Sequence, residues 1–226
     1  MTAIIERWFP YAWDLRSQFV EATWETIYMV LIACLVGGIF GLILGVIATV
    51  TRPDGLLPNQ AVYKILDNFI NIFRSIPFII LLALVSGFTR FIVGTTIGAT
   101  AASVPIVIGT IPFFARQVQI ALLEVDPGMV EAAQAMGLTP FDIIIRVYLK
   151  EGLPALLRVS ASTIISVINL TAMAGAVGGG GLGTMAIARG YQRSRMDVIL
   201  VSTILILILV FLTQIVFNAL IKKVEK

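Results

Sequence analysis

The sequence has no histidine and only one cysteine, Cys34, among its 226 residues. Without histidine the chain cannot build an H-E-x-x-H zinc site, a Ser-His-Asp triad or a histidine-ligated haem. A lone cysteine cannot form a disulfide within the chain, so Cys34 is interpreted as a small apolar residue. These absences disfavour an enzyme, and we expect a non-catalytic chain with no catalytic residues and no metal site of its own.

Phosphate-binding signals and clustered charge are also missing. Neither G-x-S-x-G nor G-x-x-x-x-G-K-[ST] occurs, and the glycine-rich "GGGGLGT" at 178–184 contains no lysine that could reach a phosphate. Charged residues make up 13% of the chain, and no block of lysine and arginine indicates nucleic acid. We therefore expect no nucleic-acid partner and no cofactor bound by this chain.

Long uncharged apolar runs dominate what is present. Hydrophobic residues make up 58% of the chain, against roughly 45–50% in a soluble domain. About 20 apolar residues are needed for a helix to cross a bilayer. The uncharged run from Ser75 to Thr89 is shorter than this, and it becomes long enough to cross the bilayer only if it extends back through Arg74 towards Asp67. The sequence predicts an all-α membrane protein with five transmembrane helices, at about 25–50, 63–88, 98–120, 154–175 and 197–221.

The remaining segments give the domain organisation. Residues 1–24 carry Trp8, Trp13 and Trp24 and are predicted to form an amphipathic, aromatic segment at the membrane interface. Residues 25–222 form the transmembrane domain and 223–226 a cytoplasmic tail. Lysine and arginine are more frequent on the side of the loop at 121–153. This bias predicts that the loop and the C-terminus are cytoplasmic and that the N-terminus is outside.

Proline, glycine and acidic residues add detail to the spans. Pro77 lies inside the second predicted span, where it should produce a kink. The stripe of Gly37, Gly41 and Gly45 in the first span would let another helix approach closely. Asp67 is the one candidate for a carboxylate within a span, which argues against proton-driven transport. It lies seven residues before Arg74, so the two could pair, or each could snorkel to the interface.

The loop at 121–153 contains signals for two short helices. Asp126 before Pro127 predicts the start of a helix over about 127–136, and Gly137 suits its left-handed C-terminal cap. Thr139 before Pro140 predicts the start of a second helix. Phe141, Ile144 and Ile145 would supply its face for packing on the bundle. The pair could dock into a cytoplasmic partner or simply link two spans.

Here the residues carry a resemblance to a known family. Glu131-Ala132-Ala133-x-x-x-Gly137, followed by Val147-x-Leu149, resembles the EAA loop of ABC importer permeases. In that family the EAA helix is the coupling helix that sits in a cleft of the ATP-binding subunit. The resemblance implies an ABC importer permease fold and the following ATPase-coupling residues: Glu131, Ala132, Ala133, Met136, Gly137 and Leu138.

Three further segments narrow the resemblance. "FRSIPFIILL" (73–82), "MAGAVGGGGLG" (173–183) and "ARGYQR" (188–193) are similar to the permeases of methionine importers, which have five spans. The implied function is the permease subunit of a methionine importer in a bacterial inner membrane. The implied partners are a second copy, two ATPase chains that bind ATP and magnesium, an external binding lipoprotein and membrane lipids. The alternatives are an importer of another amino acid or small solute, and a scaffold whose cytoplasmic hairpin recruits a partner.

Two groups of residues are candidates for the transport path. Met173, with Asn169 and Gly175, lies near the outer end of the fourth span, where a flexible side chain could plug the path. Met173 could equally fill the core. Candidate contacts with the binding protein are Gly178, Gly179, Gly180, Gly181, Tyr191 and Arg193. A flexible turn and a solvated linker are the alternative interpretations of these segments.

Overall fold

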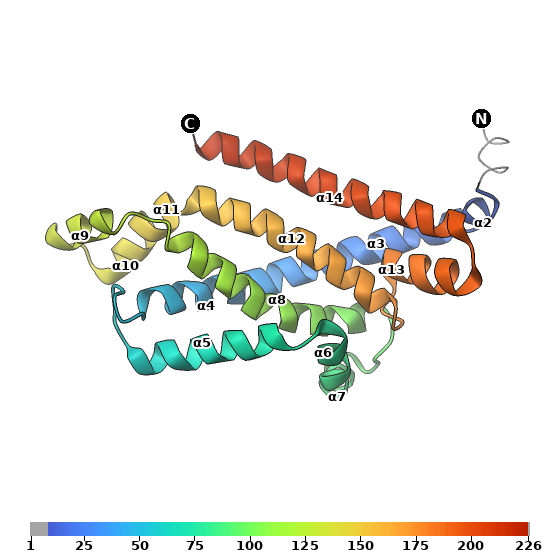
Figure 1. The fold of residues 1–226 in the computed structure, drawn as a ribbon, viewed down its shortest axis with the longest axis horizontal. Coiled ribbons are helices and arrows are strands. Elements are labelled where there is room, and N and C mark those ends of the chain that lie inside the picture. The colour runs from blue at the N-terminus through green and yellow to red at the C-terminus, as the bar shows by residue number, and fades with distance from the viewer. Residues whose placement is uncertain (1–8, 226) are drawn as a thin grey trace. The chain divides into compact units, whose positions relative to one another are not determined.

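The structure is a computed structural model that describes residues 9–225, and every element assigned there is helical (Figure 1). The first eight residues of the predicted interfacial segment, including Trp8, and Lys226 of the predicted tail lie outside the described residues. The chain forms two compact units. Unit 1 contains the residues up to Leu35 together with Pro77–Ile108 and Ile164–Thr213. Unit 2 contains Val36–Ile76, Gly109–Thr163 and the residues from Gln214 onward.

Four helical stretches in the described residues are long and apolar enough to cross a membrane. The first runs continuously over Arg16–Val50, as α3 (Arg16–Ile32), a π-helical turn (Ala33–Gly37) and α4 (Gly38–Val50). It begins at Arg16 and not at 25, so the predicted boundary between interfacial segment and first span lies within one helix. The other three are α8 (Ala99–Leu122), α12 (Leu153–Gly175) and α14 (Met196–Val224).

The segment predicted as the second span is not one continuous helix. Helix α5 (Gln60–Ser75) and helix α6 (Phe78–Leu84) are bent by 103° relative to each other. The residue before a proline avoids the helical region, and Ile76 is extended with ψ of 121°. The kink predicted at Pro77 is therefore a sharp bend. A fifth span exists if the bent pair counts as one.

Shorter helices connect these stretches. In unit 1 they are α2 (Pro10–Asp14), α7 (Ser86–Val93), α13 (Gly181–Thr184), a π-helical turn (Met185–Gly190) and a 3-10 turn (Tyr191–Arg193). In unit 2 they are α9 (Pro127–Ala135), α10 (Pro140–Ile143), a π-helical turn (Ile144–Tyr148) and α11 (Leu149–Glu151). The helices of the cytoplasmic loop predicted at 121–153 thus belong to unit 2 alone.

The core of unit 1 brings the N-terminal helices α2 and α3 together with α13 and the start of α14. Buried side chains of α2 and α3 pack against those of α13, the turn after it and α14: Ala12, Phe19, Ala22, Leu182, Met185 and Val198. The Ala12 N–H donates to Asp197 at 2.9 Å, and the Arg195 guanidinium lies 4.4 Å from the Tyr11 ring centre. These contacts fix α2 to the start of α14.

The core of unit 2 depends on close packing of α4 against α8. A Cβ added at Gly45 would lie 2.6 Å from the Val118 Cβ and 2.7 Å from the Ala115 carbonyl oxygen. A Cβ at Gly41 would lie 3.0 Å from the Ile111 carbonyl oxygen. The close approach predicted from the glycine stripe is therefore confirmed. It occurs at Gly41 and Gly45, whereas nothing lies within 4 Å of a Cβ at Gly38, which lies outside the stripe.

We expect Gly45→Ala to lower the apparent melting temperature of the purified chain. Overpacking costs about 1–3 kcal/mol, and 1 kcal/mol corresponds to about 2–4 °C in a chain of this size. Gly38→Ala is the matched control, because the same substitution in the same helix meets open space and should be neutral or slightly stabilising. Equal melting temperatures for the two variants would contradict this packing.

Candidate functional site

The first helix of the loop at 121–153, α9, begins as its sequence predicts. The Asp126 carboxylate accepts the Gly128 N–H at 2.8 Å, and Pro127 occupies the first helical position, where no donor is needed. At the other end Gly137 has φ of +76°, a left-handed conformation that a side chain would strain. The N–H groups of Gly137 and Leu138 donate to the carbonyls of Gln134 and Ala133. These two bonds complete a Schellman cap.

Helix α10 begins at a second cap. Thr139 Oγ1 accepts the Asp142 N–H at 3.2 Å and donates to Asp142 Oδ2 at 2.6 Å. Asp142 also lies 3.4 Å from Arg146, one turn further along. The predicted N-cap at Thr139 is therefore confirmed, and it fixes the start of α10.

The loop is anchored in the core of unit 2 by buried apolar side chains. Five side chains of the loop pack against α8 and α12, where their neighbours include Val118, Leu122 and Leu156. The five are Val130, Ala133, Ile143, Val147 and Tyr148. Ala133 is only 2% exposed. The sequence-based expectation that Ala133 faces the ATPase is thus wrong, because this side chain faces the chain's own core.

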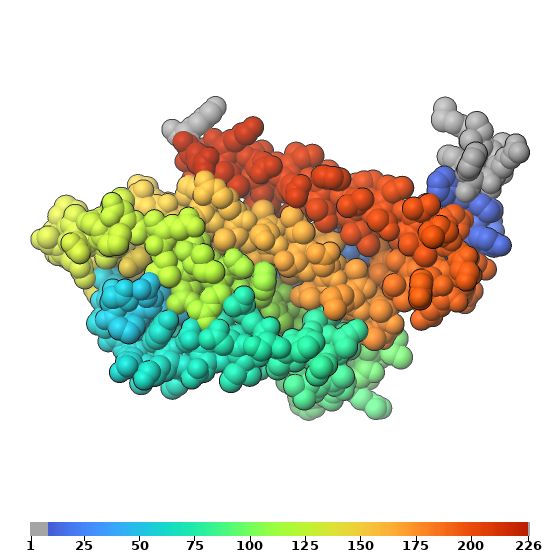
Figure 2. Space-filling view, viewed as in Figure 1, coloured from blue at the N-terminus to red at the C-terminus, as the bar shows by residue number. Residues whose placement is uncertain are grey.

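The opposite face of α9 is exposed. Met136 is 72% exposed, and Glu131 and Ala132 are also at the surface. Leu138 is partly buried against the core. Figure 2 shows the segment of α9, in yellow-green, at the surface. Phe141, predicted to pack on the bundle, is 72% exposed as well. Of the six predicted coupling residues, the structure therefore presents Glu131, Ala132, Met136 and Gly137 on the outside. The core residues Ala133 and Leu138 hold them there.

A groove of about 370 Å³ runs beside α9 in unit 2. Its walls include Glu131 and Gln134 from α9 and the turn after α4, where Arg52 and Asp54 form an ion pair at 2.6 Å. Burial raises the pKa of the Tyr148 phenol in this wall above its usual value, so the phenol stays protonated at neutral pH. The groove is therefore a mixed polar surface next to the exposed face of α9.

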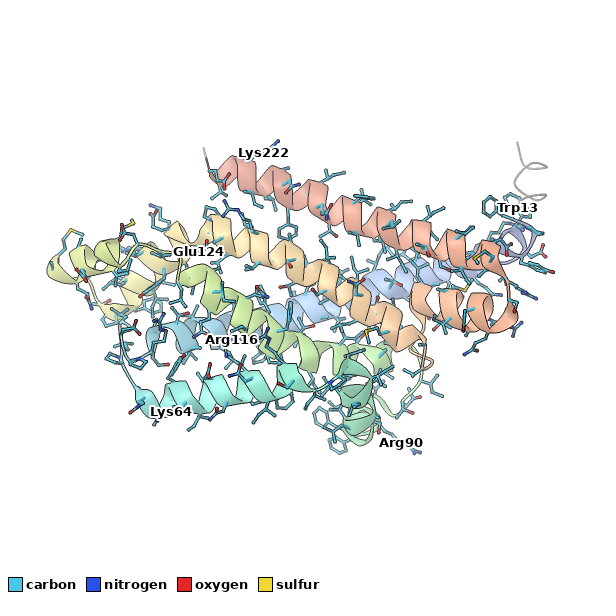
Figure 3. The ribbon with its side chains drawn as sticks, viewed as in Figure 1. Trp13, Lys64, Arg90, Arg116, Glu124 and Lys222 are labelled. Carbon is cyan, nitrogen blue, oxygen red and sulfur yellow. The ribbon has the colours of Figure 1, made fainter. Side chains whose placement is uncertain are left out.

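A charged cluster joins α5 to α8 in unit 2. Arg116, labelled in Figure 3, donates to Asp67 at 2.6 Å, to Asn71 at 2.9 Å and to Gln119 at 2.6 Å. Asn71 in turn donates to Asp67 at 3.0 Å. The pairing of Asp67 with Arg74 considered from the sequence is wrong. Asp67 and Arg116 are 49 residues apart, and no spacing rule connects them.

The three residues predicted to close the transport path, Asn169, Met173 and Gly175, lie on α12 in unit 1. Asn169 and Met173 are one turn apart on the same face and both are exposed, Met173 by 43%. Met173 therefore does not fill the core of the chain. Gly175 is buried, and a Cβ there would lie 2.4 Å from the main chain of Gly183. Its role is a close contact between the end of α12 and α13.

The glycine-rich segment after α12 is held by two side chains of α3. The Gly181 N–H donates to Glu25 Oε2 at 2.6 Å, and the Leu182 N–H donates to Thr26 Oγ1 at 2.9 Å. A Cβ at Gly181 would lie 2.7 Å from Thr26 Oγ1. The carboxylate of Glu25 thereby meets the positive end of the helical run that begins at Gly181.

This packing corrects two predicted contacts with a binding protein. Gly179 and Gly181 are buried within unit 1, so they serve internal packing. Gly178 and Gly180 are half-buried, while Tyr191 and Arg193 are exposed. The sequence gives no signal for three further residues of this segment, Glu25, Thr26 and Thr184. The Thr184 hydroxyl oxygen lies 3.0 Å from the Gly175 carbonyl and 2.9 Å from the Gly180 carbonyl, and its hydrogen is shared between them. Glu25 and Thr26 bond to main-chain N–H groups 156 residues away, and Thr184 bonds to main-chain carbonyls. Such bonds produce no recognisable motif of side chains in the sequence.

A metal centre is not part of this site as far as residues 9–225 show. No group of three or more histidine, cysteine, aspartate or glutamate residues among them could hold a metal ion. The arrangement instead comprises long apolar helices, a rigid loop with an exposed apolar face, and a glycine turn fixed by hydrogen bonds. These features define a multi-pass membrane protein that carries a short helix with one exposed face in unit 2.

Comparison with known proteins identifies the family. Residues 37–226 match the family model of binding-protein-dependent transport system inner membrane components. The chain is 45% identical to the probable D-methionine transport system permease protein MetI of Vibrio cholerae, over 98% of this chain and 97% of that protein. It is also 45% identical to the methionine import system permease protein MetP of Bacillus subtilis, over 99% of this chain and 100% of that protein. The chain belongs to this family of inner-membrane transport components.

Solved structures show the same fold. A chain of the MetNI methionine ABC transporter in an inward-facing crystal form matches with a TM-score of 0.91 and 41% identity, over 94% of this chain and 99% of that one. A chain of an amino acid ABC transporter crystallised with histidines matches with a TM-score of 0.78 at 16% identity, over 95% and 98% of the two chains. The latter shows likeness of fold alone. The predicted all-α ABC importer permease fold is confirmed.

We expect Ala133→Leu and Ala132→Leu to separate the two faces of α9. The buried Ala133 has no room for added bulk, so its variant should lose about 1–3 kcal/mol and melt at a lower temperature. The exposed Ala132 should tolerate the same change within about 0.5 kcal/mol. Thermal unfolding of the purified variants measures both. Destabilisation at 132 with no change at 133 would mean that the faces of α9 are assigned the wrong way round.

Proposed function

We propose that this chain is the permease subunit of an ABC importer for methionine. Two copies form the translocation path, two separate ATPase chains dock on the α9 helices, and an external binding protein delivers methionine. ATP and magnesium are bound by the ATPase chains, and this chain has no catalytic role. The observation that carries the proposal is an α9 helix with one face in the core of unit 2 and the other exposed. The names of the relatives supply the substrate.

The proposed coupling follows from the packing of α9. A helix fixed at both ends by caps and along one side by core contacts can transmit a push without deforming. When ATP closes the ATPase dimer, the two α9 helices would be drawn together. The core of unit 2 would carry that movement into α8 and α12. Alternating access to the path would result.

The proposed path uses residues of unit 1. Met173 and Asn169 lie on an exposed face of α12, where they could meet the corresponding face of a second copy and close the path. The exposed Tyr191 and Arg193, with the half-buried Gly178 and Gly180, are proposed contacts of the binding protein. Under this proposal the N-terminus is outside and the C-terminus is cytoplasmic.

Uptake in proteoliposomes tests the proposal. The chain is reconstituted with an ATPase of a methionine importer and its binding protein, and we expect ATP-dependent accumulation of labelled methionine. Met136→Asp should reduce ATPase co-purification by roughly 30-fold, since loss of an interface hot spot costs about 2 kcal/mol. It should also abolish uptake.

The control for this variant is Met196→Asp, a substitution at another highly exposed methionine, which lies in unit 1. It should leave ATPase binding intact. The coupling role of α9 is refuted if Met136→Asp supports normal ATPase binding and normal uptake. Accumulation of a different solute in place of methionine would retain the permease and reject the substrate.

We expect a defined labelling pattern for the proposed orientation. In a Cys34→Ala background, Arg193→Cys should react with membrane-impermeant thiol reagents in intact cells, and Thr139→Cys should react only after the membrane is opened. Both side chains are at the surface of the chain, so burial does not limit the reaction. The Cys34→Ala chain alone should remain unlabelled. The reverse pattern at 193 and 139 would invert the orientation.

A further inference from the structure

A small cavity in unit 1 lies among α6, α7, α8 and the turn after α12. It measures about 30 Å³, and apolar groups form most of its wall, including Leu82, Ala102 and Val177. Three hydroxyl-bearing residues also line it: Ser86, Thr89 and Thr96. This lining is unusual for a cavity that has mostly apolar walls, because hydroxyl groups prefer a polar partner.

The Thr89 hydroxyl has no such partner within the protein. The side chain is 4% exposed, and its oxygen is the one buried side-chain oxygen or nitrogen among residues 9–225 without a hydrogen bond. Many other helical hydroxyls of the described chain donate to the carbonyl four residues earlier, as Thr26, Thr49 and Thr163 do. Thr89 does not, which leaves its hydroxyl free to bond a group in the cavity.

Proline creates a second polar group at the same cavity. Pro105 lies inside α8 and has no N–H, so the Ala101 carbonyl cannot receive the usual helical bond from the residue four positions later. Both Ala101 and Pro105 line the cavity, and both are buried. A buried carbonyl in an apolar environment costs free energy until a donor reaches it. The cavity is thus lined on α8 by the residue whose carbonyl lacks its usual helical donor, and on α7 by Thr89 with its unpaired hydroxyl.

We propose that this cavity is a binding site for an ordered water molecule that bridges Thr89 and the Ala101 carbonyl. A buried water needs roughly 10–15 Å³ of space and two to four polar partners. The cavity offers room for one or two waters and is too small for a solute such as an amino acid. The water donates one hydrogen bond to the Ala101 carbonyl and forms a second hydrogen bond with the Thr89 hydroxyl. It thereby replaces the helical bond that Pro105 removes and ties α7 to α8.

Thr89→Val tests the site, because a bound water and a dry cavity predict changes of opposite sign in the melting temperature. Valine has nearly the same shape but no hydroxyl, so the bridging water loses a partner. Loss of a buried hydrogen bond costs about 1 kcal/mol, which is about 2–4 °C of apparent melting temperature in a chain of this size. The full-length chain, purified in detergent, should therefore melt lower. A dry cavity gives the opposite sign, because removal of an unpaired buried hydroxyl should raise the melting temperature.

Thr163→Val is the matched control, since that buried hydroxyl only supplements a main-chain bond to the Val159 carbonyl. It should shift the melting temperature by less than Thr89→Val does. Should Thr89→Val fail to fold, a high-resolution structure of the unmodified protein decides. Density for a water within hydrogen-bond distance of both Thr89 Oγ1 and the Ala101 carbonyl supports the site. Its absence in a well-ordered map, or a raised melting temperature, overturns it.

Discussion

The need to satisfy every main-chain N–H and C=O without water governs this chain, because a bilayer core supplies no hydrogen-bond partners. The chain is helical almost throughout residues 9–225, and its breaks occur where other groups take over. At Pro77 the proline carbonyl accepts from Ile80 and Leu81 and starts α6. At the glycine-rich turn, Glu25 and Thr26 receive the N–H groups of Gly181 and Leu182. These two breaks are thus tied to specific partners.

The same constraint explains why the two faces of the loop at 121–153 differ. Capping by Asp126, Gly137 and Thr139 satisfies the helix ends, and apolar burial of Val130 and Ala133 fixes the face that meets α8. The exposed face is then free to carry apolar side chains without a structural task. Exposed apolar residues on a rigid helix are suited to binding a partner. Rigidity within unit 2 is therefore the property on which the proposed coupling depends.

Local chemistry could be predicted from the sequence, and pairings across long separations could not. The caps of α9 and α10, the bend at Pro77 and the close approach at Gly45 depend on neighbours or on residue size, which the sequence displays. The sequence does not show which alanine of α9 is buried, since a small alanine suits both a core and an interface, and Ala133 lies in the core. Arg116 with Asp67, and Glu25 with Gly181, are partners only through the fold. The EAA resemblance identified the loop but not its orientation.

The central claim is that α9 moves as one body with the core of unit 2. Spin labels at 132 and 150, both exposed positions of unit 2, would report this by pulsed EPR on the reconstituted transporter. We predict one narrow within-chain distance that is unchanged between ATP-free and ATP-bound states, while the distance between the 132 labels of two copies shortens. A within-chain distance that broadens or shifts on ATP binding, with the distance between copies unchanged, would contradict the account.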